Sequence, residues 1–412
     1  MKANLTSIPT LVEAPFIIAT IGGVTFGTFM DKKNKGNLLN VTYPNFMESI
    51  QAKKINGTIN QYTLKLKYQV GIGQDPNLLD KIISKATGDR RIKLTYGDWN
   101  APNSIYKNEE AIITNVSTSL NMRDNSLDYT ITCTGDGINL TSTTYNFPRK
   151  VCKGSELLIE LLNNKRLGLT EIFKGMLNIS KVLSYGLIPT NDATIEFLPQ
   201  TNINILNYLN YVVDTMVNSA YQGLNSLPNS KYFLSIHDDV NNIFGGTYFK
   251  ITEVAANTNN VDALDTYELN INYPSDNFVT DFNINNDQSW AILYEYSEGI
   301  EQEQYSYNID DNGQLHTRYS PSILKSKYTG TISPTKAEWW AKMTKFPIEA
   351  SVTIKGLTRP SILMSYVKLN VWFAGGIKHI SSGLYIITEQ VDTLNAQGYK
   401  TQLKLLRVGG DS

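Results

Sequence analysis

The chain has few cysteines and few charged residues for its length of 412 residues. Its two cysteines, Cys133 and Cys152, favour folding in a reducing compartment and argue against a disulfide-stabilised secreted scaffold. Cys133 alternates with the apolar residues of a predicted strand, so we expect a buried thiol; a disulfide with Cys152 is the alternative. The charged fraction is 18% and the formal net charge is -1, which provides no overall field that would attract nucleic acid or a membrane surface.

No apolar run in the sequence is long enough to cross a bilayer. The longest one, residues 16–30, contains Gly22, Gly23 and Gly27, and it is shorter than the roughly 20 residues that a membrane-spanning helix needs. We predict that this run forms a strand pair or an arm that faces a neighbour in an assembly. The first residues lack the basic segment and apolar core of a secretory leader, so we expect synthesis in a cytoplasm and no stable membrane insertion.

Motifs for catalysis, cofactor binding and metal binding are missing. None of the three histidines, His237, His316 and His379, stands at ligand spacing from another histidine or a cysteine, and no nucleophile motif or phosphate loop occurs. We therefore predict no enzyme activity, no cofactor, and no catalytic, cofactor-binding or metal-binding residue. We interpret His237-Asp238-Asp239 as a solvated turn, with a metal site as the alternative, and we expect His379 in a loop or at a sheet edge.

Acidic clusters leave a glycan hydrolase open as an alternative. The clusters comprise Glu298, Glu301 and Glu303, followed by Asp310 and Asp311. Glycoside hydrolysis needs two carboxylates about 5–10 Å apart, and this distance does not follow from spacing along the chain. We interpret these residues as solvated loop, and we expect residues 300–345 to form a long excursion.

Residues that favour strands are abundant, and Tyr (24) outnumbers Phe (14). In residues 61–70 apolar and polar side chains alternate, which is typical of a half-buried strand. Residues 111–122 and 127–134 read as a hairpin around a polar turn. Helices are expected after Asp75-Pro76, with Asp75 as the N-cap, and at three further places: residues 155–164 with Ser155 as the cap, 170–177, and 203–217.

The same β unit occurs twice, once near each end of the chain. Ile112-Ile113-Thr114 matches Ile386-Ile387-Thr388, and a Leu-Asn pair begins six residues after each threonine. Aligned without a gap, three residues of the next strand fall opposite each other in the two copies: Leu127, Tyr129 and Ile131 with Thr401, Leu403 and Leu405. Upstream, residues 61–70 and 91–98 correspond to 350–357 and 366–373. Because an internal repeat determines architecture, two like barrels per chain would give a trimer six-fold-like symmetry.

The C-terminal copy resembles the second tube-like barrel of phage baseplate hub proteins, the family that includes the contractile-tail hub and the spike proteins of type VI secretion. In that family the closing hairpin carries a G-x-Y-x-I strand, a polar turn and a T-x-L-x-L-x-R strand. The matching positions are Gly383, Tyr385, Ile387, Thr401, Leu403, Leu405 and Arg407. The resemblance covers residues 346–412 and, more loosely, residues 45–145.

The resemblance implies a β-rich α+β fold with two related tube-like β-barrel domains that flank an inserted α+β region. The expected parts are an N-terminal arm or strand pair at 1–44, a first barrel at 45–149, the inserted domain at 150–345 and a second barrel at 346–412. The second barrel segment is shorter than the first. We therefore expect it to take strands from elsewhere, with the N-terminal arm as the source.

The resemblance also implies a structural protein of the virion tail baseplate, assembled in the host cytoplasm. A homotrimer would form a pseudo-six-fold ring that joins the tail tube to the spike and lets DNA pass. The expected partners are further copies of the chain, the tail tube protein, the spike or needle protein and other baseplate proteins, with genomic DNA only in transit. No lysozyme-, peptidase- or needle-like segment follows Ser412, so we expect a spike or lysin to be a separate protein.

Other classes of protein remain as alternatives. One is a hexameric distal tail or baseplate ring protein. Another is a carbohydrate-binding or receptor-binding β module that uses its tyrosines as platforms. Aromatic side chains lining one exposed groove would favour the binding module, whereas aromatic side chains that alternate into cores would not.

Overall fold

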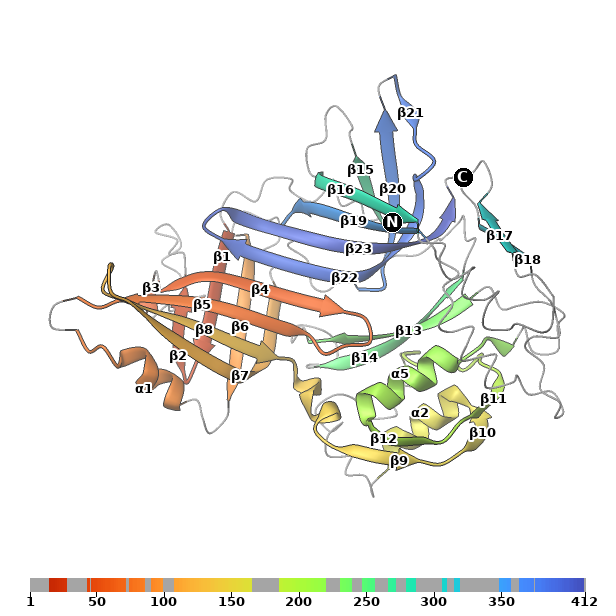
Figure 1. Ribbon diagram of the computed structural model, residues 1–412, viewed down its shortest axis with the longest axis horizontal. Helices are drawn as coiled ribbons and strands as arrows, with labels where there is room; N and C mark the ends of the chain where they lie inside the picture. The colour runs from red at the N-terminus through yellow and green to blue at the C-terminus, as the bar shows by residue number, and fades with distance from the viewer. Residues whose placement is uncertain are drawn as a thin grey trace.

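The computed structural model describes residues 15–27, 43–44, 46–71, 74–85, 90–98, 107–164, 185–219, 230–238, 247–255, 266–271, 279–286, 306–309, 315–318, 348–356, 363–373 and 375–410. Strands from both ends of the chain form one large sheet, and a smaller group of helices and strands lies beside it (Figure 1). This arrangement confirms the predicted β-rich α+β fold. No helix in the described part of the chain has the length and apolar character needed to cross a membrane.

The first unit is built mostly from antiparallel strands. In sheet order these are β4 (Met47–Ile55), β5 (Gln61–Gln69), β8 (Ser126–Thr134), β7 (Lys107–Asn121), β6 (Arg91–Asp98), β1 (Pro15–Ile21), β2 (Val24–Gly27) and β3 (Tyr43–Pro44). The predicted alternation of β5 is confirmed, because Tyr62, Leu64 and Leu66 are at most 1% exposed. Cys133 of β8 lies in the same core as an unpaired thiol, and burial raises its pKa to about 12.

The second unit takes two of its strands from the middle of the chain. Its strands are β15 (Thr266–Ile271), β20 (Tyr366–Phe373), β21 (Ile377–Lys378), β22 (Gly383–Asn395), β23 (Gly398–Gly410), β19 (Ile348–Lys355) and β16 (Val279–Asn286). β15 lies parallel to β20, and β16 lies antiparallel to β19. The expectation that the N-terminal arm supplies these strands is wrong, because β1 and β2 pair with each other and β1 pairs with β6. The strand-pair interpretation of residues 16–30 is therefore confirmed over β1 and β2.

The two units repeat the same strand order, including its irregularities. The run β4-β5-β8-β7-β6 corresponds to β16-β19-β23-β22-β20. A register shift skips Thr114 in β7 and Thr388 in β22. Each of these threonines donates a hydrogen bond through Oγ1 to a carbonyl of the neighbouring strand, Thr132 at 3.0 Å and Lys404 at 3.4 Å. Further shifts follow Met47 in β4 and Val279 in β16. The repeat thus extends to its β-bulges, which are structural features in their own right.

The ungapped alignment of the two repeats is wrong by two residues in the second strand of the hairpin. Ile131 lies opposite Val116, and Leu403 lies opposite Gln390 at the equivalent place. The cause is the turn, which comprises residues 122–125 in the first unit and only residues 396–397 in the second. Because side chains alternate with a period of two, a difference of two residues leaves every side chain on its predicted face.

The inserted region has its own core. Its elements are β9 (Thr144–Phe147), β10 (Lys150–Lys153), α2 (Gly154–Asn163), β11 (Thr194–Phe197), β12 (Gln200–Asn204), α5 (Ile205–Thr215), β13 (Ser230–His237) and β14 (Tyr248–Ala255). The strands form two-stranded pairs, and α2 and α5 pack in one apolar cluster with them. A separate hairpin joins β17 (Ser306–Ile309) and β18 (Leu315–Arg318).

Helix ends depend on contacts that the sequence predicts only in part. α1 (Leu78–Lys85) begins slightly later than predicted, but Asp75 Oδ1 accepts the expected hydrogen bond from the Asn77 amide at 2.9 Å. The predicted cap at Ser155 is wrong, because α2 begins one residue earlier and the Ser155 hydroxyl donates to Asp192 at 2.5 Å. The predicted helix at 203–217 is confirmed as α5, which is capped by Asn204. The predicted helix at 170–177 lies outside the described residues.

Candidate functional site

The two units are joined by a seam, which we define as the antiparallel pairing of β4 residues Ile50–Ile55 with β22 residues Glu389–Leu394. Side chains of the second unit enter the core of the first unit across this seam. Leu394 is 3% exposed and belongs to that core together with Tyr399. The ring of Tyr399 contacts the ring of Tyr96 edge-on, with centroids 6.4 Å apart. The seam is therefore a packed interface and more than a backbone ladder.

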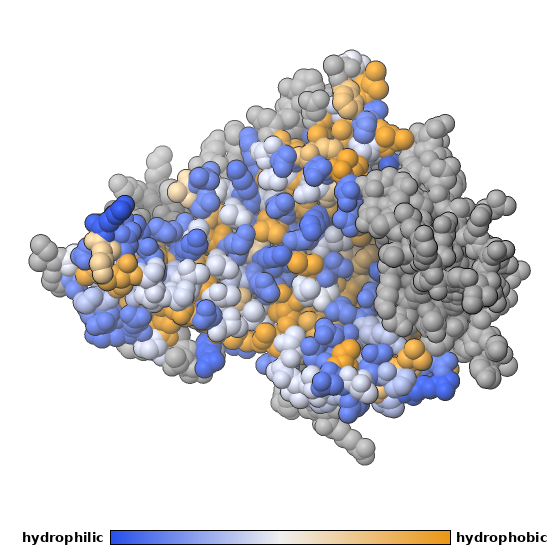
Figure 2. All heavy atoms as spheres, viewed as in Figure 1, coloured by the Kyte–Doolittle hydropathy of each residue, from blue (hydrophilic) through white to orange (hydrophobic). Residues whose placement is uncertain are grey.

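One face of the joined sheet is polar. Its strands run β16-β19-β23-β22-β4-β5-β8-β7, and their side chains alternate between the cores and this face. The face carries Ser, Thr, Asn and Gln together with charges of both signs: Lys53, Lys65, Lys67, Lys355, Lys400, Lys404, Asp128, Asp281, Glu349 and Glu389. Figure 2 shows hydrophilic residues over much of the area around β4, β5 and β8, with smaller apolar patches between them. Glu389 lies 3.3 Å from Lys404 and 3.7 Å from Lys53, so part of this charge is paired across the seam.

The turn after β4 connects the two units with the inserted region. The amide of Asn56 donates to the Thr388 carbonyl of the second unit at 3.0 Å. The amide of Gly57 donates to the Leu234 carbonyl of β13 at 2.6 Å, and Asn210 Nδ2 of α5 donates to the Gly57 carbonyl at 2.7 Å. Through hydrogen bonds of its backbone groups, this short turn connects the first unit with the second unit and with the inserted region.

Replacing Gly57 with alanine is expected to destabilise this joint. Gly57 has φ +71°, and a Cβ there would stand 2.7 Å from Asn210 Oδ1. The left-handed conformation and the collision together lower the free energy of unfolding by roughly 2–4 kcal/mol. Gly23→Ala is the matched control, because Gly23 has φ +79° with nothing within 4 Å, and it should lose only the roughly 1–2 kcal/mol of the backbone strain. Urea unfolding of both variants measures the difference, and equal losses would show that Asn210 does not confine the turn.

A buried ion pair joins a residue of the seam to β7. Lys54 of β4 and Glu109 of β7 are each 1% exposed and form a direct hydrogen-bonded pair. The Tyr96 hydroxyl donates to the other carboxylate oxygen of Glu109 at 2.9 Å. Burial alone would lower the pKa of Lys54, but attraction to Glu109 and then to Asp392 outweighs it, and the pKa is raised. Lys54 is therefore held in its charged form inside the protein.

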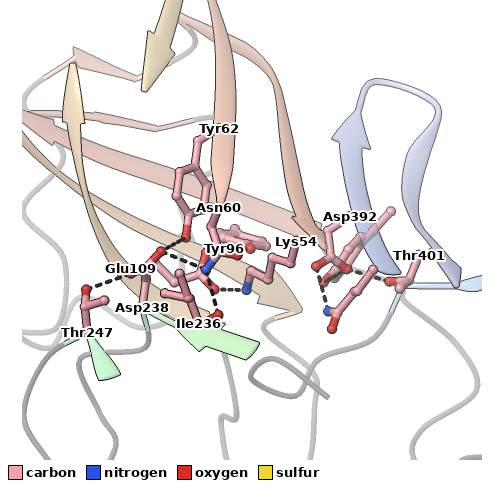
Figure 3. Close-up of polar contacts among 12 residues, drawn as sticks. Lys54, Asn60, Tyr62, Tyr96, Glu109, Ile236, Asp238, Thr247, Asp392 and Thr401 are labelled. Carbon is pink, nitrogen blue, oxygen red and sulfur yellow. Dashed lines mark hydrogen bonds and ion pairs between the residues drawn. The ribbon is translucent and has the colours of Figure 1, made fainter. Parts of the chain in front are cut away.

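The prediction of a solvated turn at His237-Asp238-Asp239 is wrong for the two residues that the structure describes. His237 is 6% and Asp238 is 2% exposed, because the end of β13 is covered by β5 and its preceding turn. Asp238 Oδ2 accepts from Asn60 Nδ2 at 2.7 Å and from the Tyr62 hydroxyl at 3.3 Å. Figure 3 shows these side chains converging on Asp238 near Lys54 and Glu109. The group is thus an internal contact between the inserted region and the first unit.

Burial shifts both of these groups toward their neutral forms. Burial raises the pKa of Asp238 to about 6, although hydrogen bonds from Thr247 and Asn60 oppose the shift. Burial lowers the pKa of His237 to about 3, helped by the positive charges of Lys250 and Lys54. The imidazole ring stacks on Tyr248 with centroids 4.8 Å apart, and Nε2 lies 3.0 Å from Ser235 Oγ. His237 is therefore a packed core residue.

A third buried carboxylate lies on the seam itself. Asp392 of β22 is 1% exposed. Its Oδ1 accepts from Thr401 Oγ1 at 2.7 Å and from the Tyr399 hydroxyl at 3.2 Å, and its Oδ2 accepts from Gln390 Nε2 at 2.9 Å. Because each oxygen is occupied by protein donors, this carboxylate suits a structural role.

The arrangement has the chemistry of a structural joint. The carboxylates of Glu109, Asp238 and Asp392 are all engaged by protein donors. Among the described residues, no group of three or more His, Cys, Asp or Glu side chains could hold a metal ion. Paired and hydrogen-bonded charges of this kind couple the positions of the strands that carry them.

Sequence reasoning missed the residues of this joint, although a signal was present. Lys54 stands in phase with the buried Ile50 and Ala52 of β4, and Asp392 stands in phase with Leu394 of β22. A charged residue at a core position of an alternating strand indicates a buried partner of opposite charge or a polar network. The partner itself, Glu109, follows only from tertiary structure.

The other residues singled out in the sequence are not brought into this site. His379 lies on the exposed stretch after β21, as predicted, and its Nδ1 is 2.6 Å from Ser381 Oγ. His316 belongs to β18, whose side chains are not among the described ones. The acids of the hydrolase alternative lie outside the described residues: Glu298, Glu301, Glu303, Asp310 and Asp311.

Comparison with known proteins finds solved structures of similar fold but no similar sequence. No protein-family model matches the sequence, and no curated protein matches it. The structure is similar to a tail protein of a Shewanella oneidensis prophage, with 9% identity, TM-score 0.49 and coverage of 97% of this chain and 100% of that one. It is similar to a Neisseria meningitidis tail protein, with 8% identity, TM-score 0.47 and 96% coverage of both chains. It is also similar to an Escherichia coli component of the type VI secretion system, with 7% identity, TM-score 0.43 and coverage of 88% of this chain and 75% of that one. These three solved structures are thus two tail proteins and a component of a type VI secretion system.

Proposed function

We propose that this protein is a structural baseplate hub of a phage tail, which forms a trimeric pseudo-six-fold ring, joins the tail tube to the spike and lets DNA pass. The observation that carries the proposal is the joining of two equivalent units, edge to edge, in one continuous sheet. Two equivalent units in each of three chains would present six similar units around a ring, which suits a component between six-fold and three-fold structures.

The polar face of the sheet supports a passage for DNA. A ring wall with many lysines and no acids would bind phosphate and release counterions, which would retain DNA. On this face the lysines are mixed with acids, and Glu389 pairs with Lys404 and Lys53. We assign the face to the lumen of the ring on this ground.

The packing of aromatic residues favours a structural role over a carbohydrate-binding module. Six tyrosines are among the largest fully buried side chains, at less than 2% exposure: Tyr62, Tyr96, Tyr129, Tyr208, Tyr232 and Tyr385. Five of them lie on strands and Tyr208 lies on α5, and all six side chains are buried. They are therefore not available as exposed sugar platforms. This is the pattern stated above as unfavourable to the binding module.

We also propose a division of the chain that follows the sheet. The second barrel begins at β15, since β15 and β16 pair with β20 and β19. The hairpin of β20 and β21 projects from this unit (Figure 1) and exposes Phe373, Ile377 and Ile380 at 52–67%. Exposed apolar residues of this kind suit contact with a protein partner such as the tube, the spike or another baseplate component.

The solution mass tests the proposal. We expect light scattering to give about three times the chain mass of 46.2 kDa. A hexamer would favour the alternative of a distal tail or baseplate ring protein. A monomer at every concentration would contradict a ring formed by this chain alone and would favour a binding module.

A further inference from the structure

We propose that β7 of one copy pairs with β16 of a second copy, antiparallel, in the register in which β22 and β4 pair inside each chain. The inference rests on the ring of the proposed function and identifies the strands that would close it. It follows from comparing the two units edge by edge.

β7 has an open edge where β22 has a covered one. Residues 115–120 of β7 are equivalent to residues 389–394 of β22, because both follow the bulge at Thr114 or Thr388. In β22 these residues pair with β23 on one side and β4 on the other. In β7 they pair with β8, and no strand in the described part of the chain pairs with their other side, since β6 ends its pairing at Ile112.

The equivalent leucines of β22 and β7 differ in exposure as the pairing of their edges predicts. Leu394 is 3% exposed beneath the seam, while its equivalent Leu120 is 58% exposed. A half-exposed leucine on an unpaired strand edge is a liability for a free monomer and a ready contact for another chain. Leu120 thus occupies the position that is buried in the other unit.

β16 offers the complementary edge. It is equivalent to β4, because Phe282 lies opposite Val352 in β19 as Ile50 lies opposite Leu64 in β5. β16 ends the sheet, and no described strand pairs with its side away from β19. Phe282 and Ile284 are only partly buried, whereas Ile50 is 1% exposed. The edge that β22 covers in the first unit is therefore open in the second.

The seam supplies the register. Leu394 pairs with Ile50 and Val391 pairs with Lys53. The equivalent contacts between two copies place Leu120 opposite Phe282 and Ser117 opposite Asn285. Each copy has one edge of each kind, so the contact is heterologous and propagates from copy to copy until it closes.

Cysteine cross-linking tests the register. The double variant Ser117→Cys/Asn285→Cys brings the two thiols onto directly opposed positions, within the Cα separation of about 7 Å that a disulfide tolerates. Thr130→Cys/Asn285→Cys is the matched control. Thr130 lies opposite Ser117 on β8, one strand further from the edge, at roughly 10 Å from Asn285. Both variants are oxidised at the concentration used for light scattering and separated on a denaturing, non-reducing gel.

We expect the first variant to give covalent dimer and trimer, and the control and both single variants to remain monomeric on the gel. A trimer by light scattering without cross-links, or with equal cross-links in the control, would overturn the strand pairing and leave the ring intact. A ladder that continues beyond trimer would support the pairing and contradict the closed ring. A monomer by light scattering would overturn both.

A charge at Leu120 gives an independent readout. Leu120→Glu should raise the concentration at which the assembly half-dissociates by roughly tenfold or more, since each lost leucine contact weakens association by over 1.4 kcal/mol. Met122→Glu is the control, because Met122 is 86% exposed in the turn beyond the paired stretch. Equal effects of the two variants would place the interface elsewhere. Neither variant should change the free energy of unfolding of the monomer appreciably.

Discussion

Replacing Lys54 with methionine is expected to lower the free energy of unfolding by roughly 3–5 kcal/mol, because Glu109 would remain buried without its counter-ion. Both side chains are 1% exposed, so water cannot take over the role of the ammonium group. Tyr96 continues to donate one hydrogen bond to Glu109, but a neutral donor does not balance a buried charge. Urea unfolding followed by fluorescence measures this loss of unfolding free energy. An unchanged m-value would show that the unfolded state is the same in both proteins.

Two comparisons separate this effect from simple loss of packing. The double variant Lys54→Met/Glu109→Met should recover most of the stability, because replacing both members of a buried pair by apolar residues is often neutral. The exposed pair of Lys81 and Asp75, at 2.6 Å with side chains 65% and 40% exposed, provides the second control. Lys81→Met should lose less than about 1 kcal/mol. A double variant as unstable as the single one would mean that the site needs its charges.

The unfolding free energy of the native protein is expected to respond little to His237 and Asp238 between pH 3.8 and about 6, because the two groups titrate in opposite directions. Folding raises the pKa of Asp238 from 3.8 to about 6. Its contribution to stability is thus complete below pH 3.8 and lost as the pH rises through about 6. Folding lowers the pKa of His237 from 6.5 to about 3. Its contribution is present above pH 6.5 and lost as the pH falls toward 3. Each slope is about 1.4 kcal/mol per pH unit, and the signs are opposite.

Removing one group should reveal the slope of the other. In Asp238→Asn the unfolding free energy should fall by roughly 3 kcal/mol as the pH is lowered from 6.5 to 4, because His237 must lose its proton on folding. In His237→Gln the free energy of unfolding should fall by a similar amount as the pH is raised from 4 to 6, because Asp238 must bind a proton on folding. Both variants also lose native contacts. That loss lowers the free energy of unfolding by the same amount at every pH and does not change its dependence on pH. Parallel pH profiles for the two variants and the native protein would contradict the assignment.

The seam inside the chain and the proposed contact between chains differ in one respect that matters for assembly. Within the chain, Gln390 and Asp392 form a buried polar network on β22. The equivalent positions on β7 are Val116 and Thr118. Polar networks specify one arrangement when every member is satisfied, which suits a permanent joint. The edge of β7 carries apolar and hydroxyl side chains instead. Burying such an edge when a partner binds costs less desolvation than burying a carboxylate.

Much of the local structure was predictable from sequence. Alternation with a period of two predicted β5 and the hairpin of β7 and β8, and a period near 3.6 predicted α5, because these patterns reflect which face of an element is buried. The internal repeat was visible in Ile112-Ile113-Thr114 and Ile386-Ile387-Thr388. The two segments are alike because each leads into the same β-bulge, at Thr114 and at Thr388.

Only the tertiary structure decided how these elements combine. The strands that complete the second unit stand far before their partners in the sequence: β15 by 100 residues and β16 by 62–75 residues. Pairing over such distances leaves no periodic signal in either strand. The burial of Asp238 and the pairing of Lys54 with Glu109 likewise depend on which surfaces meet. A strand pattern records that one face is covered, but the identity of the covering segment is a property of the whole fold.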